Sequence, residues 1–231
     1  MKNIAIIPAR SGSKCLKNKN IKLLNGKPLL AYSIEAALKS KCFDTVFVST
    51  DSKKYADIAR EYGAEVLFLR SEKNSTDKSS AWDVIRETLI VYKEFGKEFD
   101  TFMYLQPTSP LRQAKDIKNA YKLFKHLNAN SIVSVCECDA SPLYCYKLPT
   151  NKLLSKVLNI KNENKRRQEA GNYYTMNGAI YLANVKNFLK TNDIYSNKCY
   201  AYVMDKKNSI DIDDELDFKY VESIINNEKN R

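Results

Sequence analysis

Long hydrophobic runs and zinc-type cysteine pairs are both missing from this sequence of 231 residues. No stretch approaches the roughly 20 apolar residues that a membrane-spanning helix needs, so we expect no membrane span. The six cysteines include no C-x-x-C pair, and a chain of this length does not depend on disulfides for its core. These absences predict a soluble, cytoplasmic protein with reduced thiols.

Glycine is scarce, and neither glycine-rich phosphate motif is present. In IIPARSGSKCLKNKN, residues 6–20, Lys14 follows Ser-Gly-Ser and precedes Cys15, so the Walker pattern GxxxxGK[ST] fails. The dinucleotide pattern GxGxxG is also absent. The segment offers cations instead, and Arg10, Lys14 and Lys19 could neutralise a triphosphate through side-chain charge. Taken alone, the stretch fits an exposed basic loop equally well.

The formal charge of +11 raises the question of a nucleic-acid partner, because a basic surface binds phosphates. The lysines, however, are interspersed with acids, as in DSKKYADIAREYGAE, and no dense basic run occurs. The distribution favours a solvated lysine-rich surface and no nucleic-acid partner.

Strand and helix signals alternate along the chain, which predicts an α/β protein with a doubly wound, mostly parallel sheet in a single domain, residues 1–231. The predicted strands are residues 3–9, 45–50, 64–69, 100–106, 131–137, 178–183 and 199–204. The predicted helices are residues 28–40, 53–63, 79–95, 114–127 and 214–227. Such sheets bind ligands beyond the carboxyl ends of their strands. We therefore expect the loops after Ile7, Val48, Leu105 and Ile180 to surround the site.

The loop LQPTSPLR has a high density of hydrogen-bonding groups at this edge. Its two prolines fix a rigid turn, which we expect to present Gln106, Thr108, Ser109 and Arg112 to a ligand. A purely structural turn is the alternative, and the density of polar groups favours binding.

The segment SIDIDDELD alternates isoleucine with aspartate near the end of the chain. On an extended segment Asp211 and Asp213 share one face, and such a pair of carboxylates suits Mg²⁺ bound together with substrate phosphates. The alternative is a helix N-terminus, favoured by Asp213, Asp214 and Glu215. Both can hold, with Asp211 and Asp213 on the metal and the next two acids at the helix start.

Five motifs in register carry a family resemblance over nearly the whole chain. IAIIPARSGSKCLKNKNI, VSTD, LQPTSPLR, NGAIY and SIDIDDELD resemble the bacterial CMP-sialic acid synthetases, or acylneuraminate cytidylyltransferases. The resemblance implies a Rossmann-like nucleotidyltransferase fold, with a dimerisation and sugar-binding insertion at about residues 139–200 of this chain. It also implies transfer of CMP from CTP to the anomeric hydroxyl of a nonulosonic acid, with release of pyrophosphate. The implied cofactor is Mg²⁺, with Mn²⁺ as an alternative, and the implied assembly is a homodimer.

The resemblance also implies roles for individual residues. The nucleotide-binding positions are Arg10, Ser11, Lys14, Lys19, Asn20, Arg70 and Ser80, with Asp77 near the base and ribose. The sugar-binding positions are Gln106, Asn177, Tyr181 and Tyr195, the last reaching a partner's site, and the metal pair is Asp211 and Asp213. Arg167 is the nearest cation for the sugar carboxylate, because the basic residues that the family places near Tyr144 and Thr175 are absent here.

We expect Arg10, Lys19 and Asp211 to be catalytic. The single histidine, His126, falls in a predicted helix as a surface residue, so Asp211 and the metal take the place of a histidine base. The acceptor stays open between N-acetylneuraminic and legionaminic acid, for use in lipopolysaccharide or capsule. Two other readings also stay open: an enzyme for 3-deoxy-manno-octulosonate, and a non-catalytic polyanion-binding module, which the clustered carboxylates disfavour.

Overall fold

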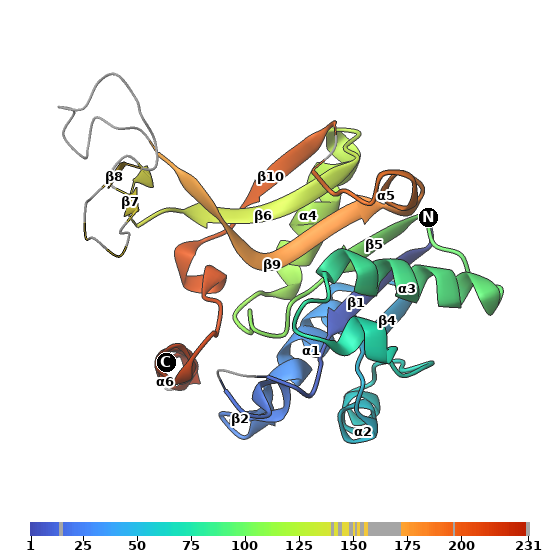
Figure 1. Ribbon diagram of the computed structural model, residues 1–231, viewed down its shortest axis with the longest axis horizontal. Helices are drawn as coiled ribbons and strands as arrows, with labels where there is room; N and C mark the ends of the chain where they lie inside the picture. Colours follow the sequence, from blue (N-terminus) through green and yellow to red (C-terminus); the bar gives the residue numbers. More distant parts are fainter. Residues whose placement is uncertain are drawn as a thin grey trace.

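A computed structural model of the chain describes residues 1–13, 16–139, 141–142, 145–147, 150, 152, 155–156, 172–195 and 197–229. A six-stranded sheet with the order β10-β6-β9-β5-β1-β4 forms its centre (Figure 1). These strands are β1 (Asn3–Pro8), β4 (Thr45–Ser49), β5 (Thr101–Tyr104), β6 (Ser131–Glu137), β9 (Tyr174–Asn184) and β10 (Cys199–Val203). Two small sheets pair β2 (Leu23–Leu24) with β3 (Lys27–Pro28), and β7 (Tyr146–Lys147) with β8 (Ser155–Lys156).

Helices cover both faces of the central sheet. The α-helices are α1 (Leu29–Ser40), α2 (Lys53–Glu61), α3 (Ala81–Glu94), α4 (Ala114–His126), α5 (Val185–Thr191) and α6 (Glu215–Lys229). Residues of α1, α2 and α4 share one buried apolar cluster with the sheet, and residues of α3 and α5 share another with its opposite face (Figure 1). Each helix buries an apolar stripe, so the doubly wound α/β architecture expected from the sequence is confirmed.

Strand β9 runs opposite to its neighbours in a central sheet whose other pairs are parallel. It pairs antiparallel with β5, where Tyr104 lies opposite Tyr181, and antiparallel with β6. Its beginning, not its end, therefore lies at the carboxyl edge of the neighbouring strands. The expectation that the loop after Ile180 borders the site is wrong, and the residues just before it take that place.

Two local features also differ from expectation. The segment 64–69 forms no regular strand, because Glu65 makes only an isolated bridge to Phe47 while Phe68 stacks on the Phe47 ring, with centroids 5.1 Å apart. Helix α5 was not predicted, since its seven residues are too few for a clear period; Asn184 caps it by accepting from the Asn187 amide at 3.1 Å. Among the described residues, no helix is both long and apolar enough to cross a bilayer.

Candidate active site

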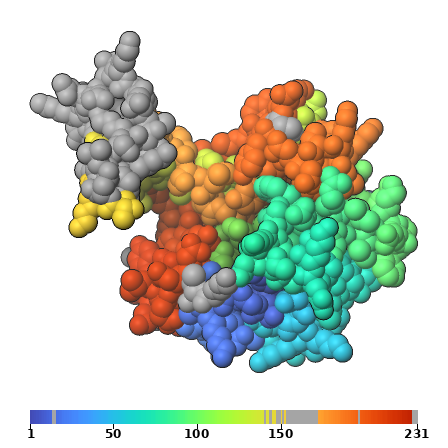
Figure 2. All heavy atoms as spheres, in the orientation of Figure 1, coloured from blue at the N-terminus to red at the C-terminus, as the bar shows by residue number. Residues whose placement is uncertain are grey.

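A cavity of about 790 Å³ opens at the carboxyl edge of β1 and β5. It is bordered by the loop after β1, the 3-10 helix η1 (Lys19–Ile21), the segment before α3, the loop after β5 and the approach to α6. Its lining residues are Pro8, Arg10, Ser13, Lys19, Asn20, Arg70, Asn74, Thr76, Asp77, Ser79, Ala81, Val84, Tyr104, Gln106, Pro107, Thr108 and Asp213. Figure 2 shows the C-terminal residues, in red-orange, beside the N-terminal residues, in blue. Distant segments of the sequence thus share one site.

The loop after β1 is held in place by polar contacts that leave Arg10 at the cavity. The buried Asn20 side chain donates to the Arg10 carbonyl at 3.0 Å. Ser11 turns away from the cavity, because its amide and its hydroxyl donate to the Asp51 carboxylate at 2.8 and 2.9 Å. Lys14 and Cys15 lie outside the described residues. Arg10 and Asn20 thus reach the cavity as expected, whereas Ser11 supports the loop.

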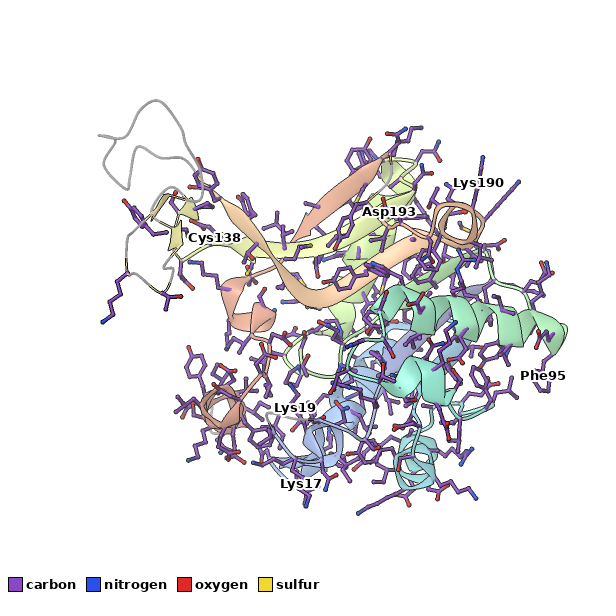
Figure 3. The ribbon with its side chains drawn as sticks, viewed as in Figure 1. Lys17, Lys19, Phe95, Cys138, Lys190 and Asp193 are labelled. Carbon is purple, nitrogen blue, oxygen red and sulfur yellow. The ribbon has the colours of Figure 1, made fainter. Side chains whose placement is uncertain are left out.

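Lys19 connects the first motif of the chain to the last. Its Nζ donates to the Ile212 carbonyl at 2.7 Å and lies 3.7 Å from Asp213 Oδ1. The Lys19 side chain is only 14% exposed, so solvent screens its charge less than that of an open surface lysine. Figure 3 shows Lys19 between α6 and α1, with Lys17 farther from the sheet. One lysine therefore faces the carboxylate pair, and its exposed neighbour does not.

Arg70 places a second guanidinium in the cavity wall. Its Nε donates to Ser49 Oγ at 3.0 Å, and its Nη2 donates to the Ser49 carbonyl at 2.5 Å. Only 7% of the residue is exposed, and burial lowers the pKa of Arg70 from its usual value, opposed by Tyr104 and Asp51. An arginine side chain stays protonated at neutral pH, so Arg70 is a cation in the cavity wall. Its two hydrogen bonds to Ser49 hold this cation in one position.

The turn after β5 divides into ligand-facing and structural residues. Gln106 and Thr108 line the cavity, while Ser109 and Arg112 are buried beneath it. Arg112 donates to the Ala179 carbonyl at 2.9 Å, to the Gln106 carbonyl at 3.2 Å and to the Ser33 hydroxyl. Burial lowers the pKa of Arg112 to about 10. The expectation that Ser109 and Arg112 face a ligand is therefore wrong, since Arg112 ties the turn to α1 and β9.

Asp211 and Gly178 lie next to the cavity-lining Gln106. The φ of Gly178 is +72°, and a Cβ there would collide with Gln106 Oε1 and lie 3.7 Å from Asp211 Oδ2. The Ile212 amide donates to the Thr108 carbonyl at 2.8 Å, which holds the aspartate segment against this turn. The importance of Gly178 was missed in the sequence, although an isolated glycine at the start of a strand is a signal of close backbone approach.

Two carboxylates at or near the cavity, Asp211 and Asp213, could hold a divalent metal. Asp211 Oδ1 is buried and has no hydrogen-bond partner among the residues that the structure describes. Burial, with the nearby charge of Asp213, raises the pKa of Asp211, and Thr108 and Lys19 oppose the rise. Asp213 is 81% exposed at the cavity. The described residues contain no group of three or more His, Cys, Asp or Glu side chains that could hold a metal. A bound Mg²⁺ would therefore need oxygens from substrate or water beside these two carboxylates.

The start of α6 separates the carboxylates that cap the helix from those at the cavity. Asp214 accepts from the amides of Leu216 and Asp217 at 2.8 and 3.0 Å, as an N-cap does. Glu215 instead pairs with Lys22, whose Nζ lies 2.6 Å from its carboxylate. Capping by Asp214 is as expected, and Glu215 anchors the helix to the N-terminal segment.

Asn177 and Ser80, which were expected to bind substrate, use their side chains for hydrogen bonds within the protein. The Asn177 side chain is buried; it donates to Ser209 Oγ at 2.9 Å and accepts from Ser134 Oγ at 2.6 Å, so it supports the start of β9 and does not line the cavity. The Ser80 hydroxyl caps α3 by accepting from the Trp82 amide at 3.0 Å, and its neighbour Ser79 reaches the cavity.

The expected aromatic residues gather around Trp82. The Trp82 ring centroid lies 5.8 Å from that of Tyr181 and 6.2 Å from that of Tyr195. Tyr181 also packs edge-on against the cavity-lining Tyr104 at 6.1 Å, and burial raises the pKa of Tyr181 to about 12. Tyr195 is half exposed. Arg167 lies outside the described residues, and His126 is exposed, as expected.

Comparison with known proteins identifies the family. A family model described as cytidylyltransferase matches residues 4–230. The chain belongs to this family. It is 42% identical to the N-acylneuraminate cytidylyltransferase of Escherichia coli O18:K1:H7 over all of this chain and 53% of that protein. It is 38% identical to the CMP-N,N'-diacetyllegionaminic acid synthase of Legionella pneumophila over 97% of each chain. The chain thus spans about half the length of the first relative and nearly all of the second.

Solved structures confirm the fold of this cytidylyltransferase. A CMP-2-keto-3-deoxy-manno-octonic acid synthetase complexed with CTP has a TM-score of 0.73 at 17% identity, covering 99% of this chain and all of the other. A 4-diphosphocytidyl-2C-methyl-D-erythritol synthase from Anaerococcus prevotii has a TM-score of 0.69 at 10% identity, covering 97% and 98%. At these identities the likeness concerns the fold alone.

Proposed function

We propose that this cytidylyltransferase transfers CMP from CTP to the anomeric hydroxyl of a nonulosonic acid and releases pyrophosphate. One observation supports this most strongly: the cations Arg10, Lys19 and Arg70 border the same cavity as Asp213, with Asp211 next to the cavity-lining Gln106. Cations suit a triphosphate, and paired carboxylates suit the metal that accompanies it.

The nucleotide-binding assignment follows the charges in the cavity. Arg10 and Lys19 would hold the phosphates, with Asn20 fixing the loop backbone, and Arg70 would bind the nucleoside end near Tyr104 and Ser79. In the reaction the sugar hydroxyl oxygen bonds to the α-phosphorus while the bond to the β-phosphate oxygen breaks. Negative charge grows on the leaving pyrophosphate, so fixed cations stabilise the transition state more than the bound substrate.

Asp211 and Asp213 would hold Mg²⁺, and the orphan Oδ1 of Asp211 supports this use. When bound, the ion would offset phosphate charge and lower the pKa of the attacking hydroxyl. Asp211 would accept the hydroxyl proton, directly or through water. Burial makes a carboxylate more basic, which suits this task better than an ordinary aspartate pKa.

The acceptor would lie on the side of Gln106, toward Tyr181 and Tyr195. Gln106 reaches the cavity beside Asp211, and the cavity-lining Tyr104 packs against Tyr181, which in turn packs against Trp82. The relatives named for N-acylneuraminate, diacetyllegionaminic acid and pseudaminic acid support a nonulosonic acid as the substrate class. We further propose a cytoplasmic homodimer that supplies activated sugar for surface glycans.

The test is a panel of acids incubated with CTP and MgCl₂ while pyrophosphate release is followed. The panel contains N-acetylneuraminic, N,N'-diacetyllegionaminic, pseudaminic and 3-deoxy-manno-octulosonic acids. We expect the highest kcat/KM with a nonulosonic acid. A preference for 3-deoxy-manno-octulosonate would overturn the acceptor class, and absence of turnover with every acid would overturn the proposed reaction.

A further inference from the structure

Asp77 and Arg10 form an ion pair inside the cavity. Arg10 Nη1 lies 2.6 Å from Asp77 Oδ1, and both residues line the cavity wall. The two side chains are 33% and 40% exposed, so a ligand in the cavity can reach this pair. The pair joins the loop after β1 to the segment before α3, 67 residues away. It is a tertiary contact at the site where the triphosphate would bind.

The segment that carries Asp77 has hydrogen bonds of its own. The Thr76 amide donates to Ser79 Oγ at 3.1 Å, Ser79 Oγ donates to the Lys73 carbonyl at 3.0 Å, and Ser75 Oγ donates to the Ser71 carbonyl at 2.7 Å. At its two ends Arg70 is bonded to Ser49, and Ser80 caps α3. The backbone that carries Asp77 is therefore held in place by bonds other than the Arg10–Asp77 ion pair.

The charges around Arg10 make Asp77 a competitor for any bound phosphate. A guanidinium that neutralises a carboxylate at 2.6 Å cannot give its full charge to a phosphate. The same carboxylate would also repel an incoming polyanion, because like charges at a few ångströms destabilise binding. Arg10 itself acts on Arg70 as a like charge, so Asp77 offsets repulsion between cations in the ligand-free cavity.

We propose that Asp77 competes with phosphate for Arg10, so that Arg10 leaves the Asp77 carboxylate when a phosphate binds. This exchange limits the affinity of the protein for both CTP and pyrophosphate. The inference rests on the proposed function, since it requires Arg10 to bind the triphosphate. Asp77 would weaken substrate binding, yet it would also return to Arg10 when pyrophosphate leaves. Asp77 would thus favour the release of pyrophosphate, and with it turnover, over tight retention of this product.

The test is the affinity of the Asp77→Asn protein for CTP with MgCl₂, measured by titration calorimetry without a sugar acceptor. We expect the Kd for CTP to be about three- to tenfold lower than that of the unchanged protein. This is the size of effect expected when an exposed ion pair and a charge that repels the ligand are both removed. Pyrophosphate should become a stronger product inhibitor by a similar factor. Asp77→Ser should change both values in the same direction, since it also removes the charge.

Glu72→Gln is the matched control, because Glu72 is an exposed acid of the same segment and does not line the cavity. Its effect on the CTP affinity should stay below about twofold. An unchanged affinity in Asp77→Asn would overturn the proposal. A weaker affinity would also overturn it and would make Asp77 a ligand of the substrate. If the unchanged protein binds no CTP, the proposed function itself fails, which these comparisons distinguish from failure of the exchange alone.

Discussion

Gly178 lies against Gln106 so closely that no side chain fits between them. A Cβ on Gly178 would collide with Gln106 Oε1 and lie 3.3 Å from its Cδ, and the φ of +72° already disfavours any residue with a side chain. The missing side chain at Gly178 leaves room for the Gln106 amide near Asp211. The turn after β5, strand β9 and the aspartate segment approach one another at this point.

Gly178→Ala tests whether this contact positions the acceptor. The left-handed backbone should cost about 1–2 kcal/mol of stability, and the methyl group should displace the Gln106 side chain. We expect KM for the sugar acid to rise about tenfold or more, with KM for CTP nearly unchanged. Gly96→Ala, at φ +74° and with no atom within 4 Å of its Cβ, controls for backbone strain alone. If the two variants have equal kinetics, the contact has no positioning role.

Lys19 and Lys17 provide a matched pair of lysines two residues apart in the sequence. Lys19 is mostly buried beside Asp213, whereas Lys17 is exposed and away from the cavity. Lys19→Met should lower kcat/KM for CTP about a hundredfold, because a cation at the developing phosphate charge is lost. Lys17→Met should change it less than about twofold. Steady-state kinetics with varied CTP measure both values, and similar losses in the two variants would contradict the assignment.

Asp211→Asn should lower the activity of the protein without lowering its stability. The raised pKa means that protonated Asp211 favours folding at low pH, and this contribution is lost as the pH rises through that pKa. At neutral pH the ionised group is therefore a cost in the metal-free protein. We expect Asp211→Asn to unfold at an equal or higher temperature without metal, while its kcat falls by at least about a hundredfold.

The same variant tests the metal assignment by a second readout. Addition of MgCl₂ with CTP should raise the unfolding temperature of the unchanged protein more than that of Asp211→Asn. Asp57→Asn, an exposed change on α2, should behave like the unchanged protein. An equal rise in Asp211→Asn would show that the metal binds elsewhere.

Arg112 should matter for stability before it matters for catalysis. Its loss removes the guanidinium donor from the Ala179 carbonyl and the Ser33 hydroxyl in a buried site, while the Gln106 carbonyl keeps the Ser33 hydroxyl and the Ser109 amide as donors. At about 1–3 kcal/mol for each unsatisfied group, Arg112→Ala should lower the free energy of unfolding by about 2 kcal/mol or more. Denaturant unfolding measures this, and a loss below about 1 kcal/mol would contradict the structural role.

Local sequence patterns were sufficient for most of the fold. Continuous apolar strands such as β1 and amphipathic helices such as α4 follow from residues adjacent in the chain. The direction of β9 does not, because its pairing depends on where the chain returns after residue 139. The short helix α5 and the irregular 64–69 segment likewise depend on packing against the sheet.

The site was predicted in part, for a similar reason. Charged residues that reach the cavity, such as Arg10, Lys19 and Asp213, belong to motifs with a clear chemical purpose. Asn177 and Arg112 have equally polar side chains but use them to join distant elements, which their spacing cannot reveal. The Arg10–Asp77 pair also joins distant segments and is visible only in three dimensions.

Product identification tests the central claim most directly. The protein would be incubated with CTP, MgCl₂ and one nonulosonic acid at a time, and the products separated and weighed by mass spectrometry, with Asp211→Asn as the blank. We expect a CMP-linked sugar acid and one equivalent of pyrophosphate from at least one acid. CTP left intact with every acid, or CMP released without a linked sugar, would contradict cytidylyl transfer.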